Sequence, residues 1–388
     1  MATKTKKKQK RFSAFAGKPF DFILCITILL LLSLGIVMVL SASSPSSLAE
    51  SGDSYSYVRK QAAFGVLGVI LMVIISKIDY RFYKKYYKIA YIIGILLLII
   101  VLIPGIGRII NGARRWINIG TSFQPSEAVK ILLIVFYAGL LTKNKDKLEK
   151  FGEGFMYHLL FLIPIVGLLL LEPHLSASIV IIGIVAIMMI VAGCKFKHFL
   201  VSGLTVGIPG LLMLIILEPY RLQRFTTFLN PWADTQGEGW QVIQGLYAIG
   251  SGGLFGAGLG ESKQKFLYIP EPHNDFIFAV LAEELGFIGC VAVILLFAIF
   301  IWRGILIAMK APDMFGSLLA IGITSLVGLQ VIINIAVVTS SMPATGMPLP
   351  FFSYGGTALV ILLCACRRLT EHFKSRFKSI NKDGINCG

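Results

Sequence analysis

The residues Tyr268-Ile-Pro-Glu-Pro-His-Asn-Asp275 lead directly into the apolar run Phe276-Ile-Phe-Ala-Val-Leu281. This run opens a segment, 276–302, that exceeds the length of about 20 residues a helix needs to cross a bilayer. The carboxylate of Asp275 is therefore expected at the mouth of a membrane helix. There it could cap the helix start, or it could accept a proton in chemistry on a lipid-borne substrate.

The rest of the chain has the composition of a membrane protein. Of its 388 residues, 56% are hydrophobic and only 14% are charged, which excludes an ordinary soluble domain. The first apolar segment is too long for a cleavable signal peptide. We expect an all-α polytopic membrane protein with about ten transmembrane helices. The predicted spans are 20–43, 61–78, 89–105, 126–142, 156–171, 175–194, 198–217, 276–302, 314–339 and 352–366.

The distribution of basic residues predicts that both ends of the chain are cytoplasmic. With the N-terminus inside, 26 of the 36 Lys and Arg residues fall on the inner side and nine on the outer side, as the positive-inside rule requires. The net charge of +16 then indicates a surface attracted to lipid headgroups rather than to nucleic acid. We divide the chain into a basic tail, 1–19, a ten-helix membrane domain, 20–366, and a second basic tail, 367–388.

The longest outer segment, 218–275, holds many aromatic residues. Because these can bury surface, we expect a large structured extracytoplasmic loop between helices 7 and 8 rather than disorder. Within it, Trp240-Gln-Val-Ile-Gln-Gly-Leu-Tyr-Ala-Ile249 is predicted to form a short amphipathic or re-entrant helix. The glycine-dense stretch 250–260 matches no phosphate-binding pattern. We interpret it first as a packing and turn element and second as a substrate contact.

Charged residues also occur where a membrane protein should avoid them. The outer loop 105–125 contains Arg114-Arg115-Trp116, which could anchor the chain at the interface or bind an anion, because guanidinium groups match phosphate oxygens in two-point geometry. Glu127 and Lys130 are three residues apart on one helical face, inside expected hydrocarbon. They could form a structural ion pair or line a functional polar cavity.

Two further carboxylates lie deeper in the helix that follows Asp275. At 1.5 Å per residue, Glu283 and Glu284 are about 12 Å beyond it. In helical projection only Glu283 could line the same cavity as Asp275, and Glu284 is expected to pair with a neighbouring helix. The Pro/Gly-broken segment 345–356 enters the last span from outside and is expected to be buried in protein or to line a cavity.

The cysteines and histidines predict no disulfide framework and no metal site. None of the six cysteines falls in a predicted outer loop, and the five histidines lack metal-ligand spacing. Because the chain has no nucleotide-binding glycine loop, its energy source is expected to be the substrate itself or a gradient.

Seven motifs, in order along the chain, resemble the shape, elongation, division and sporulation family, which includes FtsW, RodA and SpoVE. They are Asn111-Gly-Ala-Arg-Arg-Trp116, Phe123-Gln-Pro-Ser-Glu127, Phe228-Leu-Asn-Pro231, Gly239-Trp-Gln241, Pro270-Glu-Pro-His-Asn-Asp-Phe-Ile-Phe278, Glu283-Glu-Leu-Gly286 and Pro348-Leu-Pro-Phe-Phe-Ser-Tyr-Gly-Gly356. The similarity extends from the first span to Arg368. The first motif and the basic N-terminal tail favour FtsW or SpoVE over RodA. The chain departs from the family at Glu172-Pro-His174, where Gln-Pro-Asp is expected, so no role is transferred there.

The resemblance implies a peptidoglycan glycosyltransferase that polymerises lipid II at the outer face of the bacterial cytoplasmic membrane, in cell division or sporulation. It implies that Asp275 is the essential acid, acting as a general base, with undecaprenyl pyrophosphate as the leaving group. A lipid II flippase is the alternative activity. The residues expected to bind substrate or pyrophosphate are Arg115, Glu127, Lys130, Arg221, Arg224, Gln241, Gln244, His273 and Ser353.

The resemblance also implies partners. These are a class B penicillin-binding protein with transpeptidase activity, other divisome proteins and membrane lipids, with the division septum as the expected location. A divalent cation, Mg²⁺ or Mn²⁺, could share the charge of the pyrophosphate, although no ligand cluster in the sequence demands one.

Overall fold

The computed structural model describes residues 21–75, 80–110, 112–118, 120–235, 237–266 and 268–370. The predicted basic tail 1–19 lies outside these residues. So does the second predicted tail, 367–388, apart from its first four residues.

Membrane-length helices dominate the described residues. Nine segments are long and apolar enough to cross a bilayer, and a shorter apolar helix follows as the tenth. This confirms the predicted all-α polytopic fold. The segments are α2 (Phe22–Ser51), α3 (Ser56–Ile75), α4 (Arg81–Leu102), α5 (Pro125–Lys143), α6 (Tyr157–Leu171) with the π-helical turn Phe151–Met156 before it, α7 (Leu175–Ala192), α8 (Phe196–Ser202) continuing through Gly203–Gly207 into α9 (Ile208–Ile216), α12 (Ile277–Met309), α13 (Met314–Val338) and α14 (Gly356–Thr370).

Several helices begin or end beyond the predicted spans. The helix α4 begins at Arg81, eight residues before the predicted 89, and α2 ends at Ser51 rather than 43. Apolar runs mark only the part of a helix that crosses hydrocarbon, whereas backbone hydrogen bonding continues through polar residues at the membrane surface.

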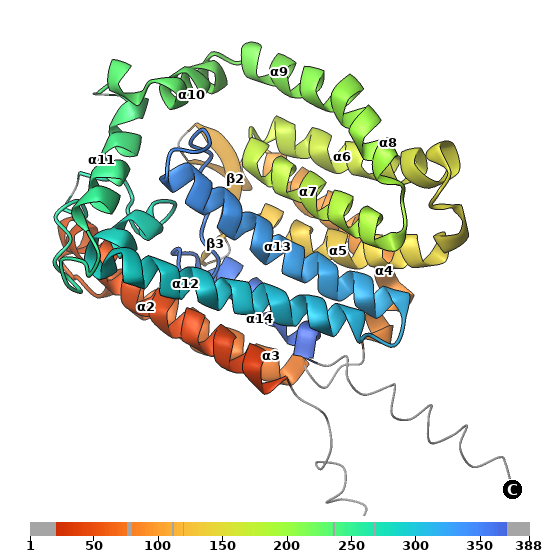
Figure 1. Ribbon diagram of the computed structural model, residues 1–388, viewed down its shortest axis with the longest axis horizontal. Helices are drawn as coiled ribbons and strands as arrows, with labels where there is room; N and C mark the ends of the chain where they lie inside the picture. Colours follow the sequence, from red (N-terminus) through yellow and green to blue (C-terminus); the bar gives the residue numbers. More distant parts are fainter. Residues whose placement is uncertain are drawn as a thin grey trace, which may run out of the picture.

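The centre of the bundle consists of α5 and α13, the two spans that bury the largest share of their apolar residues. Helix α13 packs against α5, α7 and α12, while α2 packs against α3 and α12, and α14 packs mainly against α3. The span formed by α8 and α9 differs, because none of its apolar stretch is buried in the protein. Figure 1 shows it arching over α6 and α7.

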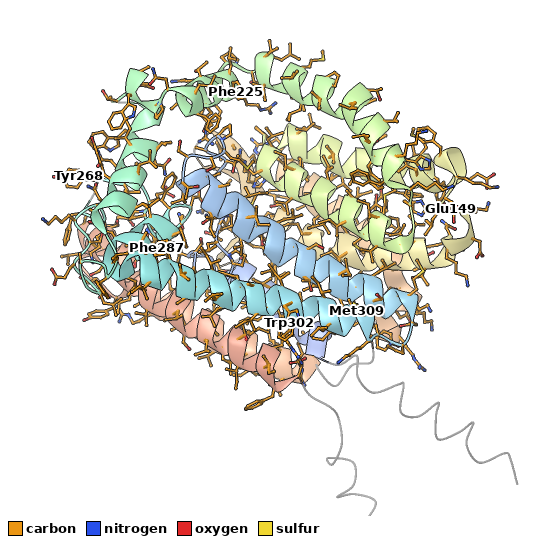
Figure 2. The ribbon with its side chains drawn as sticks, viewed as in Figure 1. Glu149, Phe225, Tyr268, Phe287, Trp302 and Met309 are labelled. Carbon is orange, nitrogen blue, oxygen red and sulfur yellow. The ribbon has the colours of Figure 1, made fainter. Side chains whose placement is uncertain are left out.

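The two ends of the bundle can be told apart by α2 and α12. The guanidinium group of Arg303, near the end of α12, donates to Asp21 at the start of α2. The start of α2 therefore lies at the opposite end of α12 from Asp275, as the predicted cytoplasmic N-terminus requires. In Figure 2, Trp302 and Met309 lie toward the end of the bundle where α2 begins. Tyr268 and Phe287 lie toward the opposite end, where α12 begins.

The long outer segment is structured, as predicted. It contains α10 (Pro219–Leu229), a short 3₁₀ turn (Pro231–Ala233) and α11 (Glu238–Ser251). Helix α11 is the predicted amphipathic helix, and it packs against α12. Its residue Trp240 donates the indole N–H to the carbonyl of Tyr268, at 2.7 Å. This bond ties α11 to residues 268–275, which lead into α12 and which we term the connector.

The glycine-dense stretch fills a break in α12. Gly286 interrupts the helix with φ +66°, and four backbone groups beside the break are paired with the stretch instead. The bonds are Ala257 N–H to Glu283 O (2.9 Å), Gly258 N–H to Glu284 O (3.0 Å), Phe287 N–H to Gly253 O (2.9 Å) and Ile288 N–H to Leu254 O (3.2 Å). Backbone groups left free near a membrane must find partners within the protein. The predicted packing role is therefore confirmed.

A small β-sheet that was not predicted lies in the outer loop between α4 and α5. The strands β1 (Gly107–Ile110), β2 (Ala113–Asn118) and β3 (Ser122–Phe123) form an antiparallel sheet in the order β1-β2-β3. The dipeptide Asn111-Gly112 is the strongest short-range hairpin signal in a sequence, and Gly112 has φ +75°. The sheet matters because β2 carries Arg115.

Candidate active site

Asp275 lies just before α12, in a half-buried position. The capping position of α12 is Phe276, and no side chain caps the helix, so the helix-cap alternative for Asp275 is wrong. Burial and, to a smaller extent, the charge of Glu271 raise the pKa of Asp275, whereas Arg224 and Arg115 lower it, and the net value is about 6. This carboxylate can therefore accept a proton near neutral pH.

Three consecutive residues, 344–346, join Asp275 to two other parts of the protein. The guanidinium of Arg224 on α10 donates to the carbonyl of Ala344 at 3.0 Å, and the hydroxyl of Ser176 on α7 donates to the carbonyl of Thr345. The carboxylate of Asp275 lies against Gly346, where an added Cβ would be 3.1 Å from Oδ2. This segment, which we term the hub loop, therefore aligns an acid with an arginine from the outer segment.

The guanidinium of Arg115, on β2, reaches the turn between α6 and α7. It donates from Nε to the carbonyl of Glu172 at 3.2 Å and from Nη2 to the carbonyl of Pro173. Burial is the main cause that lowers the pKa of Arg115, and the charges of Arg224 and Arg221 add to it. The three guanidinium groups are therefore close enough to interact. A planar guanidinium keeps its charge and has further N–H donors for an anion.

Polar side chains at the start of α5 and the start of α7 lie in the same region of the protein, where the charge of Lys130 acts on His174. Lys130 Nζ lies 2.7 Å from Glu127 Oε1, and both side chains are largely buried, so the ion pair considered for these residues is present. His174 caps α7 by accepting the N–H of Ala177 at Nδ1, at 3.1 Å. Its Nε2 lies 2.9 Å from the amide of Gln124. Burial, Arg115 and Lys130 lower the pKa of His174 to about 3, so the ring stays neutral, as this cap requires.

Two residues expected to bind substrate serve contacts within the protein. The hydroxyl of Ser353 donates to the carbonyl of Asn274 at 2.6 Å and accepts the N–H of Leu349 at 2.7 Å. His273 is buried, and its ring centroid lies 4.6 Å from that of Tyr57 and 5.8 Å from that of Tyr354. Both hold the connector beside Asp275. Their roles toward substrate stay predictions.

The remaining predicted ligands lie on α10 and α11. On α11, Gln241 is 3.5 Å from the carbonyl of Pro270 through Nε2, and Gln244 is buried. On α10, Arg221 donates to the carbonyl of Leu214 at 3.1 Å. The helix of the two glutamines therefore lies toward the connector, and Arg221 lies toward the end of α9.

Glu283 does not line a cavity with Asp275, and that expectation is wrong. Its carboxylate accepts the hydroxyl of Ser262 and the backbone N–H groups of Lys263 and Gln264. The helical projection failed because the outer segment folds back onto α12 and takes up this face. Glu284 does pair with a neighbouring helix, as predicted, since it accepts the hydroxyl of Ser41 on α2. It also forms a buried ion pair with Lys265 at 2.9 Å.

Two buried amides that the sequence analysis missed hold the site together. Asn334 on α13 donates to the carbonyls of Asp275, at 2.8 Å, and Met347, at 2.6 Å. Gln61 on α3 donates to the carbonyl of Ser353 and accepts the N–H of Gly355, both at 3.2 Å. Each is a polar residue inside an apolar span, the signal that could have identified them.

Within the described ranges, no group of three or more His, Cys, Asp or Glu residues is arranged to hold a metal ion. The predicted divalent cation therefore has no ligand set of its own here, and no chemical step is assigned to one.

The fold and the site together define a multi-pass membrane protein with a half-buried carboxylate beside guanidinium groups at one end of the bundle. This arrangement suits a substrate with an anionic group at the membrane surface. The chain belongs to the cell cycle protein family of FtsW, RodA and SpoVE, because the model of that family matches residues 22–372.

Individual proteins of known name agree with this assignment. The chain is 45% identical to stage V sporulation protein E of Bacillus subtilis (strain 168), over 89% of this chain and 94% of that protein. It is 41% identical to a probable peptidoglycan glycosyltransferase FtsW of Geobacter sp. (strain M18), over 89% and 94%.

Solved structures agree as well. A chain from work on polymerization and crosslinking by a peptidoglycan synthase complex superposes with a TM-score of 0.77 at 30% identity, covering 92% of this chain and 99% of that chain. The rod shape determining protein RodA of Thermus thermophilus superposes with a TM-score of 0.67 at 29% identity, covering 92% and 98%.

Proposed function

We propose that this protein is a peptidoglycan glycosyltransferase that polymerises lipid II at the outer face of the cytoplasmic membrane, with Asp275 as the general base. Relatives named as probable glycosyltransferases of this kind support the activity. The observation that carries the assignment of the base is the position of Asp275, half-buried against Gly346 and electrostatically coupled to Arg115 and Arg224.

The proposed reaction is a glycosyl transfer between two lipid-linked sugars. The 4-hydroxyl of one disaccharide attacks the anomeric carbon of the terminal sugar of the growing glycan, and undecaprenyl pyrophosphate leaves. Asp275 takes the hydroxyl proton, a contribution worth about 10²–10⁴ in rate. Arg115 and Arg224 stabilise the negative charge that develops on the pyrophosphate.

The other predicted ligands are proposed to act around these three residues. Arg221 would extend the cationic surface along α10, and the ion pair of Glu127 with Lys130 would support the turn that binds Arg115. Gln241, Gln244, His273 and Ser353 are proposed to shape the connector side of the substrate site.

A class B penicillin-binding protein is the proposed partner, and the septum the proposed location, with other divisome proteins. Similarity to a chain from a peptidoglycan synthase complex supports a partner that crosslinks the polymer. A divalent cation stays a prediction.

The proposed activity is tested by measuring how fast the purified protein, together with its transpeptidase, polymerises lipid II. Asp275→Ala is expected to lower polymer formation about 10²–10⁴-fold. Glu261→Gln, which alters an exposed carboxylate of the same outer segment, is the control and should polymerise at the rate of the unaltered protein. Full polymer yield from Asp275→Ala would refute the assignment, and lipid II movement across vesicles without polymer would favour the flippase alternative.

A further inference from the structure

We propose that Asn334 is a positioning residue for this reaction, because it fixes the carboxylate of Asp275 relative to Arg224. The inference rests on the proposed function and extends it to α13. Asn334 lies near the outer end of that helix and is almost fully buried. It bonds two chain segments at once, through the carbonyls of Asp275 and Met347.

The chemistry of the two bonds requires an amide. A neutral side-chain –NH₂ offers two N–H donors, and here each finds a carbonyl. A serine hydroxyl could serve only one of them, an ionised aspartate neither, and a lysine would bring an unpaired charge into a buried place. Asparagine is thus suited to joining two carbonyls at this position.

The two carbonyls belong to the two sides of the site. One is that of the proposed base itself. The other, at Met347, directly follows Gly346, against which the Asp275 carboxylate lies. Two residues before Gly346, the carbonyl of Ala344 accepts from Arg224. By holding Asp275 and Met347 together, Asn334 sets the spacing between the base and the guanidinium group.

Other contacts keep the connector attached without Asn334. Ser353 donates to the carbonyl of Asn274, and Tyr354 donates its N–H to the carbonyl of His273 at 2.9 Å. These bonds involve the last part of the 345–356 segment rather than the hub loop. Loss of Asn334 should therefore loosen the hub loop relative to Asp275 and leave the fold intact.

Loosening has an electrostatic consequence that separates positioning from stability. Desolvation is the main cause that raises the pKa of Asp275. When water reaches the carboxylate more easily, its pKa falls toward the ordinary value, and the acidic limb of the pH–rate profile moves to lower pH. A purely structural role would lower the amount of folded protein and leave that limb in place.

The experiment compares Asn334→Ala with Gln330→Ala in polymerisation of lipid II by the full protein and its transpeptidase, from pH 5 to 8. Gln330 lies one turn away on α13 and is also buried. Asn334→Ala should lower kcat about 10–100-fold, the cost of misplacing a catalytic group by about 1 Å. It should change KM little and shift the acidic limb to lower pH, while Gln330→Ala should match the unaltered protein in both.

An unshifted acidic limb, or a loss no larger than that of Gln330→Ala, would overturn the inference. If Asn334→Ala does not fold, Asn334→Ser, which keeps one donor, is judged by the same two criteria. Asp275→Ala is measured in the same assay, so that the role of Asp275 as the base and the role of Asn334 in positioning it are tested separately. An inactive Asp275→Ala with a normal Asn334→Ala refutes only the role of Asn334, whereas a fully active Asp275→Ala refutes both.

Discussion

The carboxylate of Asp275 reaches the backbone of Gly346 so closely that a methyl group there would be 3.1 Å from Oδ2. Gly346 also has φ +64°, a conformation that side chains other than hydrogen disfavour. Two independent constraints therefore keep residue 346 a glycine. The location of the proposed base depends on the absence of a side chain opposite it.

Gly346→Ala should lower the rate of lipid II polymerisation about 10–100-fold, because the new methyl group displaces the carboxylate and strains the hub loop. Initial rates with saturating lipid II measure the effect. Gly355→Ala is the matched control, because its Cβ would meet only an ordinary contact at 3.7 Å. Equal rates for the two variants would show that contact with Gly346 does not position the base.

The polymerisation rate should follow the ionisation of Asp275. Its pKa is raised to about 6, and only the ionised form accepts a proton, so the rate should fall about tenfold per pH unit below pH 6 and level off above it. Removing the negative charge in Glu271→Gln should shift this limb to lower pH, because Glu271 raises the pKa of Asp275. Initial rates at constant ionic strength provide the profile, and a flat profile between pH 5 and 7 would contradict the assigned base.

The buried pair of Lys265 and Glu284 should be costly to break. Their side chains are 4% and 0% exposed, so Lys265→Met leaves a carboxylate without its counter-ion, at a cost of about 3–5 kcal/mol in the free energy of unfolding. The double variant with Glu284→Gln should recover much of that loss, because no unpaired charge remains. Thermal unfolding in detergent measures both. A double variant as unstable as the sum of its single variants would mean that the two residues are not coupled.

Glu172 should make stability depend on pH. Both its carboxylate oxygens are buried without a hydrogen-bond partner among the described residues. Burial raises its pKa from 4.5 to about 8, although Arg115 lowers it. Between pH 4.5 and 8, Glu172 is ionised in the unfolded chain but still protonated in the folded protein. The free energy of unfolding therefore falls as pH rises through this range.

Glu172→Gln should remove this contribution. The unfolding temperature of the unaltered protein is expected to fall between pH 5.5 and 8 by about 2 °C or more beyond that of the variant. The exposed substitution Glu261→Gln serves as the reference. Parallel pH dependence of all three proteins would show that Glu172 is ionised in the folded state.

Features that depend on composition and local pattern could be predicted from the sequence. The spans follow from apolar length, α11 follows from its amphipathic stripe, and the pairing of Glu127 with Lys130 follows from helical spacing. The place of Asp275 at the start of α12 follows in the same way. Each of these signals lies within one segment, where periodicity and charge suffice.

The features that the sequence analysis missed arise between segments. Asn334 bonds residues on two other segments, and nothing local to α13 indicates where its amide points. Glu283 was misassigned because a helical projection does not include the outer segment that folds back onto it. The β-sheet is the exception, since Asn111-Gly112 was a local signal for a hairpin.

The hub loop gives each of three neighbouring residues a different partner: α10 through Ala344, α7 through Thr345 and the base through Gly346. The contacts of this segment are therefore fixed residue by residue along the chain. Deleting or adding a single residue there would move every partner by one place, so the count of peptide units in this segment constrains the enzyme as strictly as the identity of its acid.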